Sequence, residues 1–139
     1  MGIRRKAREL ALKTLFEADF NGQVLTTIFD RIQHTEQPEP DALRFLEQIL
    51  QAYTAHKSEI NKTIEKNSNN WKLARMASVD RNILRLGVAE ILFLEDVPKN
   101  VTINEYLEIA KKFGTEESSS FVNGILDKIV KGKGEGVRD

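Results

Sequence analysis

Hydrophobic residues recur every three or four positions along most of the chain, which is the spacing of one face of an α-helix. No segment shows the strict alternation of apolar and polar residues that is typical of a β-strand. The first stretch with helical spacing carries Ala7, Leu10, Ala11, Thr14, Leu15 and Ala18. The pattern therefore predicts an all-α protein of about seven helices.

Turn-forming residues separate the predicted helices of the first half. Asn21-Gly22 is expected to end the first helix. The loop Glu36-Gln37-Pro38-Glu39-Pro40 follows a weaker helical stretch, because each proline keeps its predecessor away from helical angles. Residues 41–66 then keep a helical pattern, with a break expected near His56–Ser58.

The run Asn67-Ser68-Asn69-Asn70 is the clearest linker inside the chain. It predicts a single domain made of two small packed helical bundles. The N-terminal subdomain would cover residues 1–69 and the C-terminal subdomain residues 70–131. Residues 132–139 are predicted to form a flexible tail, because the ends of a chain are often poorly ordered.

The second half has sharper boundary signals. Residues 83–94 are nearly all apolar, so this helix is predicted to be central in its bundle and to end before Pro98. Thr102-Ile103-Asn104-Glu105 has the form of a capping box, in which two side chains satisfy free backbone N–H groups at a helix start. Gly114 is expected to end that helix, and Thr115 to begin the last one.

The composition excludes several kinds of chemistry. Of 139 residues, 40% are hydrophobic and 30% charged, and no apolar run approaches the roughly 20 residues that a membrane-spanning helix needs. The absence of cysteine excludes disulfides, thiolate catalysis and cysteine-based metal centres, and two histidines are too few for a histidine-rich site. The absence of cysteine is compatible with a reducing cytoplasm, and no cofactor is expected.

Positive charge is concentrated at the front of a chain whose net charge is zero. In a helix, Arg4 and Arg8 would lie one turn apart on one face, a spacing that suits successive phosphates. RNA or DNA binding is one interpretation, and a solvated helix start is the other, although cations at a helix N-terminus oppose the macrodipole. Residues 1–16 hold Arg4, Arg5, Lys6, Arg8 and Lys13 against Glu9 alone.

Two residues of the predicted last helix allow both a functional and a packing interpretation. Phe121 follows Ser118-Ser119-Ser120 and would either offer its ring to an unpaired base or belong to the core. Gly124 lowers helix stability, which is explained if another helix, or a ligand, approaches closely. The sequence by itself favours packing for both residues.

The acidic residues give no sign of catalysis. Carboxylates that could be considered for acid–base chemistry are Asp80, Glu90, Glu105 and Glu108. No serine–histidine pair, metal-type cluster or phosphate-binding glycine loop accompanies them. The sequence thus favours a binding protein over an enzyme.

Four motifs occur in a fixed order along the chain. They are RRKARELALKTLF from Arg4, DRNILRL from Asp80, VPKNVTINE from Val97, and AKKFGTEE from Ala110 continuing into FVNGILD from Phe121. Together they resemble the NusB family of bacterial transcription antitermination factors, over about residues 3–131. The resemblance implies two small helical bundles, no enzymatic activity, and binding of boxA RNA jointly with NusE, a ribosomal small-subunit protein. The resulting complex would help RNA polymerase pass terminators, especially on ribosomal RNA operons.

The resemblance also assigns expected roles to individual positions. Lys6 interrupts the arginine run, and Ser119 and Ser120 stand where relatives often carry a glycine or histidine and then a lysine. RNA affinity without NusE is therefore expected to be low. By motif position, Arg4, Arg5 and Arg8 would contact RNA, Phe121 would stack on or touch it, Glu117 would tune affinity at the edge of the RNA surface, and Asp80 would face NusE.

Two alternatives stand beside this hypothesis. One is a protein-interaction module, or a homodimer formed through the N-terminal helix, with no RNA specificity of its own. The other is an enzyme, because the fold resembles the N-terminal domain of certain RNA cytosine methyltransferases. A chain of 139 residues without cysteine lacks both their catalytic domain and its nucleophile.

Overall fold

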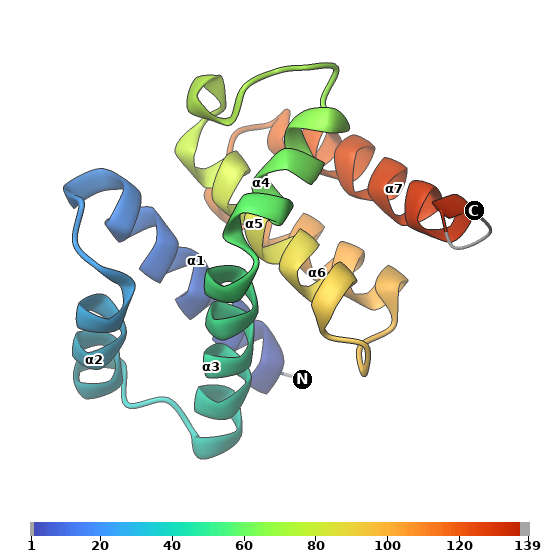
Figure 1. Cartoon of the computed structure of the whole chain (residues 1–139). Coiled ribbons are helices and arrows are strands. Elements are labelled where there is room, and N and C mark those ends of the chain that lie inside the picture. Colours follow the sequence, from blue (N-terminus) through green and yellow to red (C-terminus); the bar gives the residue numbers. More distant parts are fainter. Residues whose placement is uncertain (1, 137–139) are drawn as a thin grey trace.

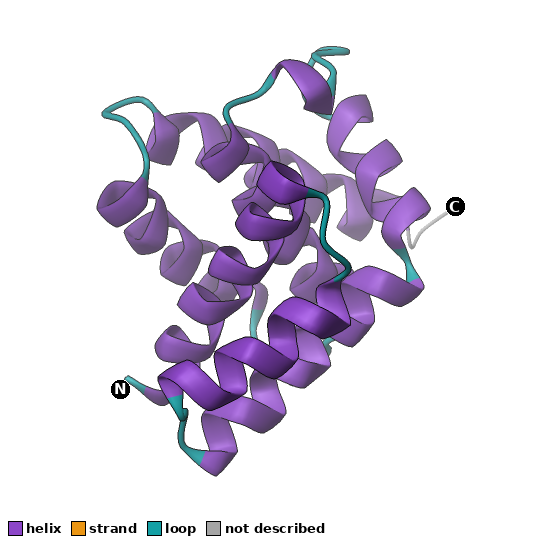
Figure 2. Ribbon diagram, turned by 90° about the vertical axis from the view of Figure 1, so that its left-hand side faces the viewer, coloured by secondary structure: helices purple, strands orange, loops and turns teal. Residues whose placement is uncertain are grey.

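The computed structural model describes residues 2–136, with side chains over residues 2–132. In this part of the chain all regular structure is helical, and no strand occurs (Figures 1 and 2). The all-α prediction is confirmed. The helices are α1 (Ile3–Asn21), α2 (Leu25–Glu36), α3 (Pro40–Ala55), α4 (Lys57–Lys66), the short 3₁₀ turn η1 (Leu73–Arg75), α5 (Ser78–Phe93), α6 (Lys99–Phe113) and α7 (Ser118–Gly136).

Helix α5 forms the centre of the molecule, as its apolar sequence predicts. Helices α1, α3, α4, α6 and α7 all pack against it (Figure 1). Ile83, Leu84, Leu86 and Ile91 of α5 are fully buried. Their side chains join those of both halves of the chain in one hydrophobic cluster, which stabilises the fold by removing apolar surface from water.

The glycine that permits close helix packing lies in α5 and not in α7. A Cβ added at Gly87 would come within 3.1 Å of a methyl carbon of Leu126, so α7 approaches the α5 backbone there. A Cβ at Gly124 would meet nothing within 4 Å. The expectation that another helix packs closely on Gly124 is therefore wrong, because this residue is on the exposed side of α7.

Several helix boundaries follow the sequence signals. Gly22 ends α1 in the left-handed conformation, with φ of 72°, which glycine adopts without strain. His56 separates α3 from α4, and Gly114 follows the last residue of α6. Asn69 and Asn70 both have positive φ, at 55° and 65°, and turn the chain sharply between α4 and η1.

Two predicted helix starts are wrong. Helix α6 begins at Lys99, so Thr102 and Glu105 lie inside the helix and form no capping box. Thr102 is buried, and its hydroxyl donates a hydrogen bond to Glu90 instead. Helix α7 begins at Ser118, whose buried hydroxyl accepts a hydrogen bond of 2.9 Å from the Thr115 backbone N–H.

The last helix is longer than the sequence suggests. Helix α7 continues to Gly136, so the first residues of the predicted tail at 132–139 are helical. Residues 137–139 lie outside the described residues. Among the helices that the structure describes, none has the length and hydropathy needed to cross a membrane.

Candidate nucleic-acid interface

The Arg8 guanidinium is buried at the junction of α1, α5 and α6, with 2% of the residue exposed. Its Nε and Nη2 donate hydrogen bonds of 2.9 Å to the two carboxylate oxygens of Glu90. The Tyr106 hydroxyl donates to Glu90 Oε2 at 2.6 Å, and the Thr102 hydroxyl to Oε1 at 3.3 Å. Both oxygens of this fully buried carboxylate are therefore satisfied, which burial of a charge requires.

The electrostatics of this buried cluster keep Arg8 charged. Burial by itself lowers the pKa of Arg8, but the hydrogen bonds and the negative charge of Glu90 outweigh it, so the pKa is raised overall. Burial, followed by the nearby Glu90 charge, raises the pKa of Tyr106 well above its ordinary value. Tyr106 therefore remains a neutral hydrogen-bond donor, and the cluster fastens three helices to one another.

The structure does not favour the expectation that Arg8 contacts RNA, because its guanidinium is buried in the isolated chain. Arg4 and Arg8 do share a helix face, as their spacing predicts: their guanidinium carbons lie 4.4 and 5.0 Å from the centroid of the Phe45 ring. That face points toward α3. Arg8 is buried because it pairs with the carboxylate of Glu90. Glu90 lies 82 residues further along the chain, so a local sequence pattern does not reveal this partner.

Arg5 and Arg4 remain partly accessible at the start of α1. Arg5 donates from Nε and Nη2 to the two oxygens of Glu105, both at 2.8 Å. The hydrogen bond from Arg5 lowers the pKa of the Glu105 carboxyl, with the charge of Arg5 adding to the effect. Arg4 is half-exposed, and its Nη2 lies 3.5 Å from Asp96.

The remaining cations of this surface also have carboxylate partners. Lys6 and Lys13 both face Glu36, at 3.8 and 3.0 Å, and Lys112 of α6 lies 3.2 Å from Glu9. The basic front of the sequence is therefore neutralised within the protein. It offers phosphate contacts only where a ligand shares or displaces these carboxylates.

Phe121 lies in the first turn of α7 and is partly buried, with its ring at the edge of the hydrophobic core. It meets the indole of Trp71 edge to face, with ring centroids 6.4 Å apart and an interplanar angle of 68°. Trp71 is 54% exposed. Sequence reasoning missed Trp71, although its place directly after four polar turn residues was a signal of exposure.

The two predicted acidic positions lie near this aromatic pair in the chain but make few bonds. Glu117 is exposed in the turn before α7, with a carboxylate oxygen 3.5 Å from the Thr115 hydroxyl. Asp80 lies in the first turn of α5. Its Oδ1 is buried and has no hydrogen-bond partner among the described residues. A buried polar atom without a hydrogen-bond partner is uncommon in folded proteins and lowers stability.

The predicted site residues fall into two groups at opposite ends of α5. The arginines of α1 lie near its last turn, where Glu90 is, and near Asp96 beyond it. Phe121 and Trp71 lie by its beginning, because Trp71 precedes α5 and Arg81 holds that segment through the Met76 carbonyl oxygen at 3.0 Å. Sixteen residues of helix separate the groups by about 24 Å.

A shallow groove of about 430 Å³ lies between the two groups. Lys6, Lys13 and Phe16 of α1 line it together with Val79 of α5 and Phe113 of α6. Lys6 is next to Arg5 in sequence, and Phe113 is the last residue before the turn that leads to Glu117 and Phe121. Glu9 and Glu36 line the groove as well, and none of the site residues predicted from the sequence does.

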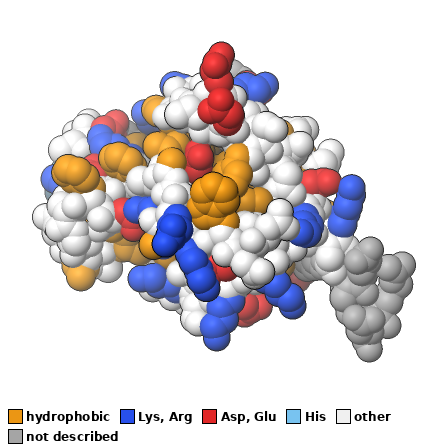
Figure 3. Space-filling model, turned by 90° about the horizontal axis from the view of Figure 1, so that it is seen from above, with side chains coloured by type: hydrophobic (Ala, Val, Ile, Leu, Met, Phe, Trp, Pro, Cys, Tyr) orange, Lys and Arg blue, Asp and Glu red, His pale blue; other side chains and the backbone are white. Residues whose placement is uncertain are grey.

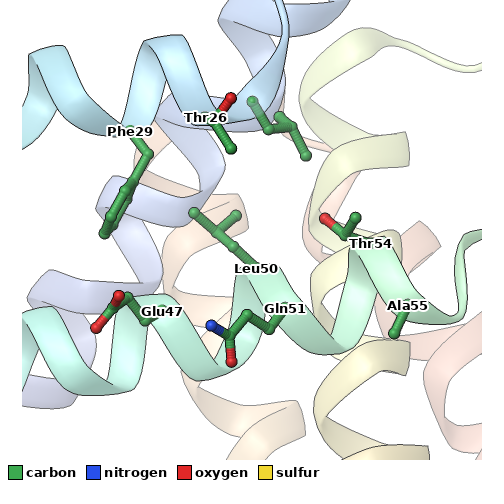
Figure 4. A pocket seen from close by; sticks show the side chains of 8 residues that line it. Thr26, Phe29, Glu47, Leu50, Gln51, Thr54 and Ala55 are labelled. Atoms are coloured by element: carbon green, nitrogen blue, oxygen red, sulfur yellow. The ribbon is translucent and has the colours of Figure 1, made fainter.

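A larger hollow, of about 500 Å³, lies between α2 and α3 (Figure 4). Phe29 of α2 and Leu50 of α3 face it, with Glu47 at its edge (Figure 4). None of the site residues predicted from the sequence lines it. No group of three or more His, Asp or Glu side chains suited to a metal ion occurs among the described residues.

Comparison with known proteins matches this chain to the NusB family over residues 5–131. The chain belongs to the NusB family. The transcription antitermination protein NusB of Myxococcus xanthus is 40% identical over 133 residues, which cover 93% of this chain and 95% of the relative. NusB of Geobacter sulfurreducens is 45% identical over 130 residues, with 93% and 94% covered.

Solved NusB structures share the fold of this chain. The structure of T. maritima NusB has a TM-score of 0.86 and 40% identity, and covers 92% of this chain and 90% of its own. A structure of the antitermination factors NusB and NusE in complex with dsRNA contains a chain with a TM-score of 0.87 and 30% identity, with 95% and 98% covered. The resemblance to the NusB family is thereby confirmed.

Proposed function

We propose that this NusB-family chain is a transcription antitermination factor. It binds boxA-type RNA together with NusE and promotes read-through by RNA polymerase, notably on ribosomal RNA operons. The observation that carries the proposal is the full-length likeness to curated NusB proteins and to the NusB chain solved with NusE and RNA. The role assigns no catalytic step and no cofactor to the chain, and places it with the polymerase in the cytoplasm.

The RNA in this proposal follows the line from the front of α1 to the start of α7. Arg4 and Arg5 contact phosphates at one end, because both guanidiniums are partly exposed. The groove beside α1 guides the strand toward Phe121, where a base contacts the aromatic ring and contributes sequence preference. Arg8 takes no direct part and acts by holding α1 against α5 and α6.

Intramolecular ion pairing explains why a second protein is needed. Arg4, Arg5, Lys6 and Lys13 each face a carboxylate, so the surface attracts a polyanion weakly. A partner that binds the same RNA makes the second contact intramolecular and raises the overall affinity without new contacts on this chain. Asp80 is the proposed meeting point with NusE because of its motif position, and the residue is partly exposed in the first turn of α5.

Binding of a fluorescent boxA-type RNA tests the proposal, measured with and without NusE against a scrambled RNA at fixed salt. Tighter binding of the boxA-type RNA, strengthened by NusE, is the expected result. Equal weak binding of both RNAs, with no help from NusE, would overturn the proposal. Light scattering across concentrations adds a second check, because a tight homodimer that persists with RNA would favour the protein-interaction alternative.

The role of Asp80 has its own control. Asp80→Ala should reduce the help that NusE gives while leaving binding of RNA to the isolated protein unchanged. Asp127→Ala, which removes the same charge from a partly exposed position in α7, should change neither quantity. If NusE raised the RNA affinity of both variants equally, Asp80 would not be part of the NusE contact.

A further inference from the structure

Trp71 is a large aromatic side chain held in an exposed position by a rigid turn. The Ser68 hydroxyl lies 2.9 Å from the Trp71 carbonyl oxygen and 3.2 Å from that of Glu65, and the Trp71 N–H donates to the Ser68 carbonyl at 3.0 Å. Past the tryptophan, the Leu73 N–H donates to Glu65 Oε2 at 2.9 Å. The backbone on both sides of the indole is thus fixed while about half of the residue faces solvent.

The indole does not stand alone, because the Phe121 ring supports it edge to face. Phe121 is partly buried and packs against the hydrophobic core, so it anchors the pair, whereas Trp71 presents the more accessible ring. Edge-to-face pairing is a favourable aromatic geometry. It leaves the face of one ring available for stacking with a third planar group.

Two cations lie within four residues of Trp71 in sequence. Arg75 is exposed, and among the described residues its guanidinium has no partner. Lys72 is exposed as well, and its Nζ forms a long ion pair of 4.0 Å with Glu65. Seen from above, over the connection between α4 and α5, hydrophobic side chains gather at the centre of this face, with both basic and acidic side chains around them (Figure 3).

An exposed aromatic ring with an unpaired arginine four residues away suits binding of a single-stranded nucleic acid. Bases stack on aromatic side chains, and the adjacent phosphates meet the cations. A protein-docking surface would extend the apolar area around the indole, but Asn69, Asn70, Lys72 and Arg75 surround it in sequence and are exposed polar residues. The chemistry therefore favours RNA over an apolar protein surface.

We propose that Trp71 and Phe121 form a two-ring platform on which an unpaired RNA base stacks, with Arg75 on the neighbouring phosphate. The proposal rests on the RNA-binding function proposed above and adds Trp71 and Arg75 to it. Trp71 then supplies the more exposed ring, and Phe121 contacts the base while it also supports the indole. The platform takes single-stranded RNA, because a base inside a duplex offers no free face.

The chain contains one tryptophan, so its own fluorescence reports on this site. Unlabelled single-stranded RNA is titrated into the full chain, with and without NusE, and the Trp71 emission is recorded. Fluorescence anisotropy of a labelled copy of the same RNA measures total binding in parallel. Stacking predicts quenching of the emission along the same curve as the anisotropy, and no comparable quenching by a fully paired duplex.

Variants separate stacking from a structural contribution. Trp71→Ala should weaken RNA binding about 5- to 150-fold, the range that corresponds to loss of one stacked base, whereas Trp71→Phe should retain most of the affinity. Arg75→Ala should reduce the slope of log affinity against log salt by about 0.7. The matched control is Phe20→Ala, since Phe20 is 84% exposed at the end of α1 and should leave binding unchanged. Circular dichroism checks that each variant folds.

The outcomes distinguish this platform from the proposed function. RNA that binds by anisotropy without quenching Trp71, and equally well to Trp71→Ala, overturns the platform and leaves the RNA-binding function intact. Loss of NusE binding in Trp71→Ala, with RNA binding unchanged, also overturns it and makes Trp71 a protein contact. Absence of RNA binding even with NusE refutes the function itself, and the platform with it.

Discussion

The two ends of α5 carry charge and aromatic groups in opposite ways. At the arginine end, four cations lie within five residues of sequence, yet Arg8 is buried and Arg4, Arg5 and Lys6 each face a carboxylate. At the aromatic end, the sequence shows no basic cluster, but Trp71 is exposed and Arg75 has no partner among the described residues. Density of charge in sequence is therefore a poor guide to charge available at a surface.

The difference also separates stability from binding. Arg8 fastens α1 to α5 and α6 and contributes to the fold, while Trp71 and Phe121 form part of a surface. Arg5 lies between these extremes, because it is partly exposed and tightly paired. A change at Arg8 should therefore affect the free energy of unfolding, and a change at Trp71 or Phe121 the RNA affinity. A change at Arg5 should affect both quantities to a small extent.

The largest effect is expected for Arg8→Ala. Removing one partner leaves the Glu90 carboxylate buried and uncompensated, which should cost about 3–5 kcal/mol of unfolding free energy in urea denaturation. Arg8→Met combined with Glu90→Leu removes both charges and should recover much of the loss. A stable Arg8→Ala variant with weakened RNA binding would instead restore Arg8 to the RNA surface.

Phe121→Ala should act mainly on RNA binding. Loss of one aromatic contact is worth about 1–3 kcal/mol, or roughly 5- to 150-fold in affinity. Because the ring also packs at the edge of the core, Phe121→Leu is the control that keeps apolar packing while removing the aromatic face. RNA titrations measure the affinity of both variants, after each has been checked for folding. Unchanged affinity in both variants would mean that Phe121 has a purely structural role.

Hydrophobic periodicity predicted most of the fold. It revealed the helical class and the central position of α5, while turn-forming residues marked breaks such as those at Gly22 and Gly114. These features follow from interactions between residues close in sequence, together with burial of an apolar stripe. The Thr102–Glu105 capping box failed because both side chains have stronger distant partners, Glu90 and Arg5, that a four-residue pattern does not contain.

The candidate site was less predictable for the same reason. Arg8 and Arg5 look alike in sequence, and only their partners on α5 and α6 make one buried and the other accessible. The sequence pointed to Gly124 as the glycine that allows close packing, but the close contact is at Gly87. The crossing of α5 and α7 determines which glycine lies at the contact. The exposure of Trp71 was not predicted, because it depends on a turn whose geometry is set by Ser68 and two asparagines.

Glu105→Gln should leave Arg5 without its carboxylate partner, so that the arginine end, like the aromatic end, carries an unpaired arginine. The change weakens the hold on Arg5 and frees its guanidinium for phosphate, so RNA affinity should rise by up to about fivefold, since partly exposed pairs are worth about 0.2–1 kcal/mol. Glu108→Gln is the matched control, because it removes the same charge from an exposed position of α6. Equal gains in the two variants would mean that net charge alone matters.

The same pair should make stability depend on pH. Arg5 holds the pKa of Glu105 below its ordinary value near 4.5, so the folded state binds the Glu105 proton more weakly than the unfolded state does. The pair therefore stabilises the protein fully above that ordinary value, and the contribution is lost as the pH falls through the lowered folded pKa. Unfolding free energies of the wild type and of Glu105→Gln, measured from pH 7 to pH 3, should differ by about 0.2–1 kcal/mol at neutral pH and converge in acid. A difference that persists at pH 3 would show that Glu105 contributes through packing or neutral hydrogen bonds, and Arg5 would then be held by something other than its charge.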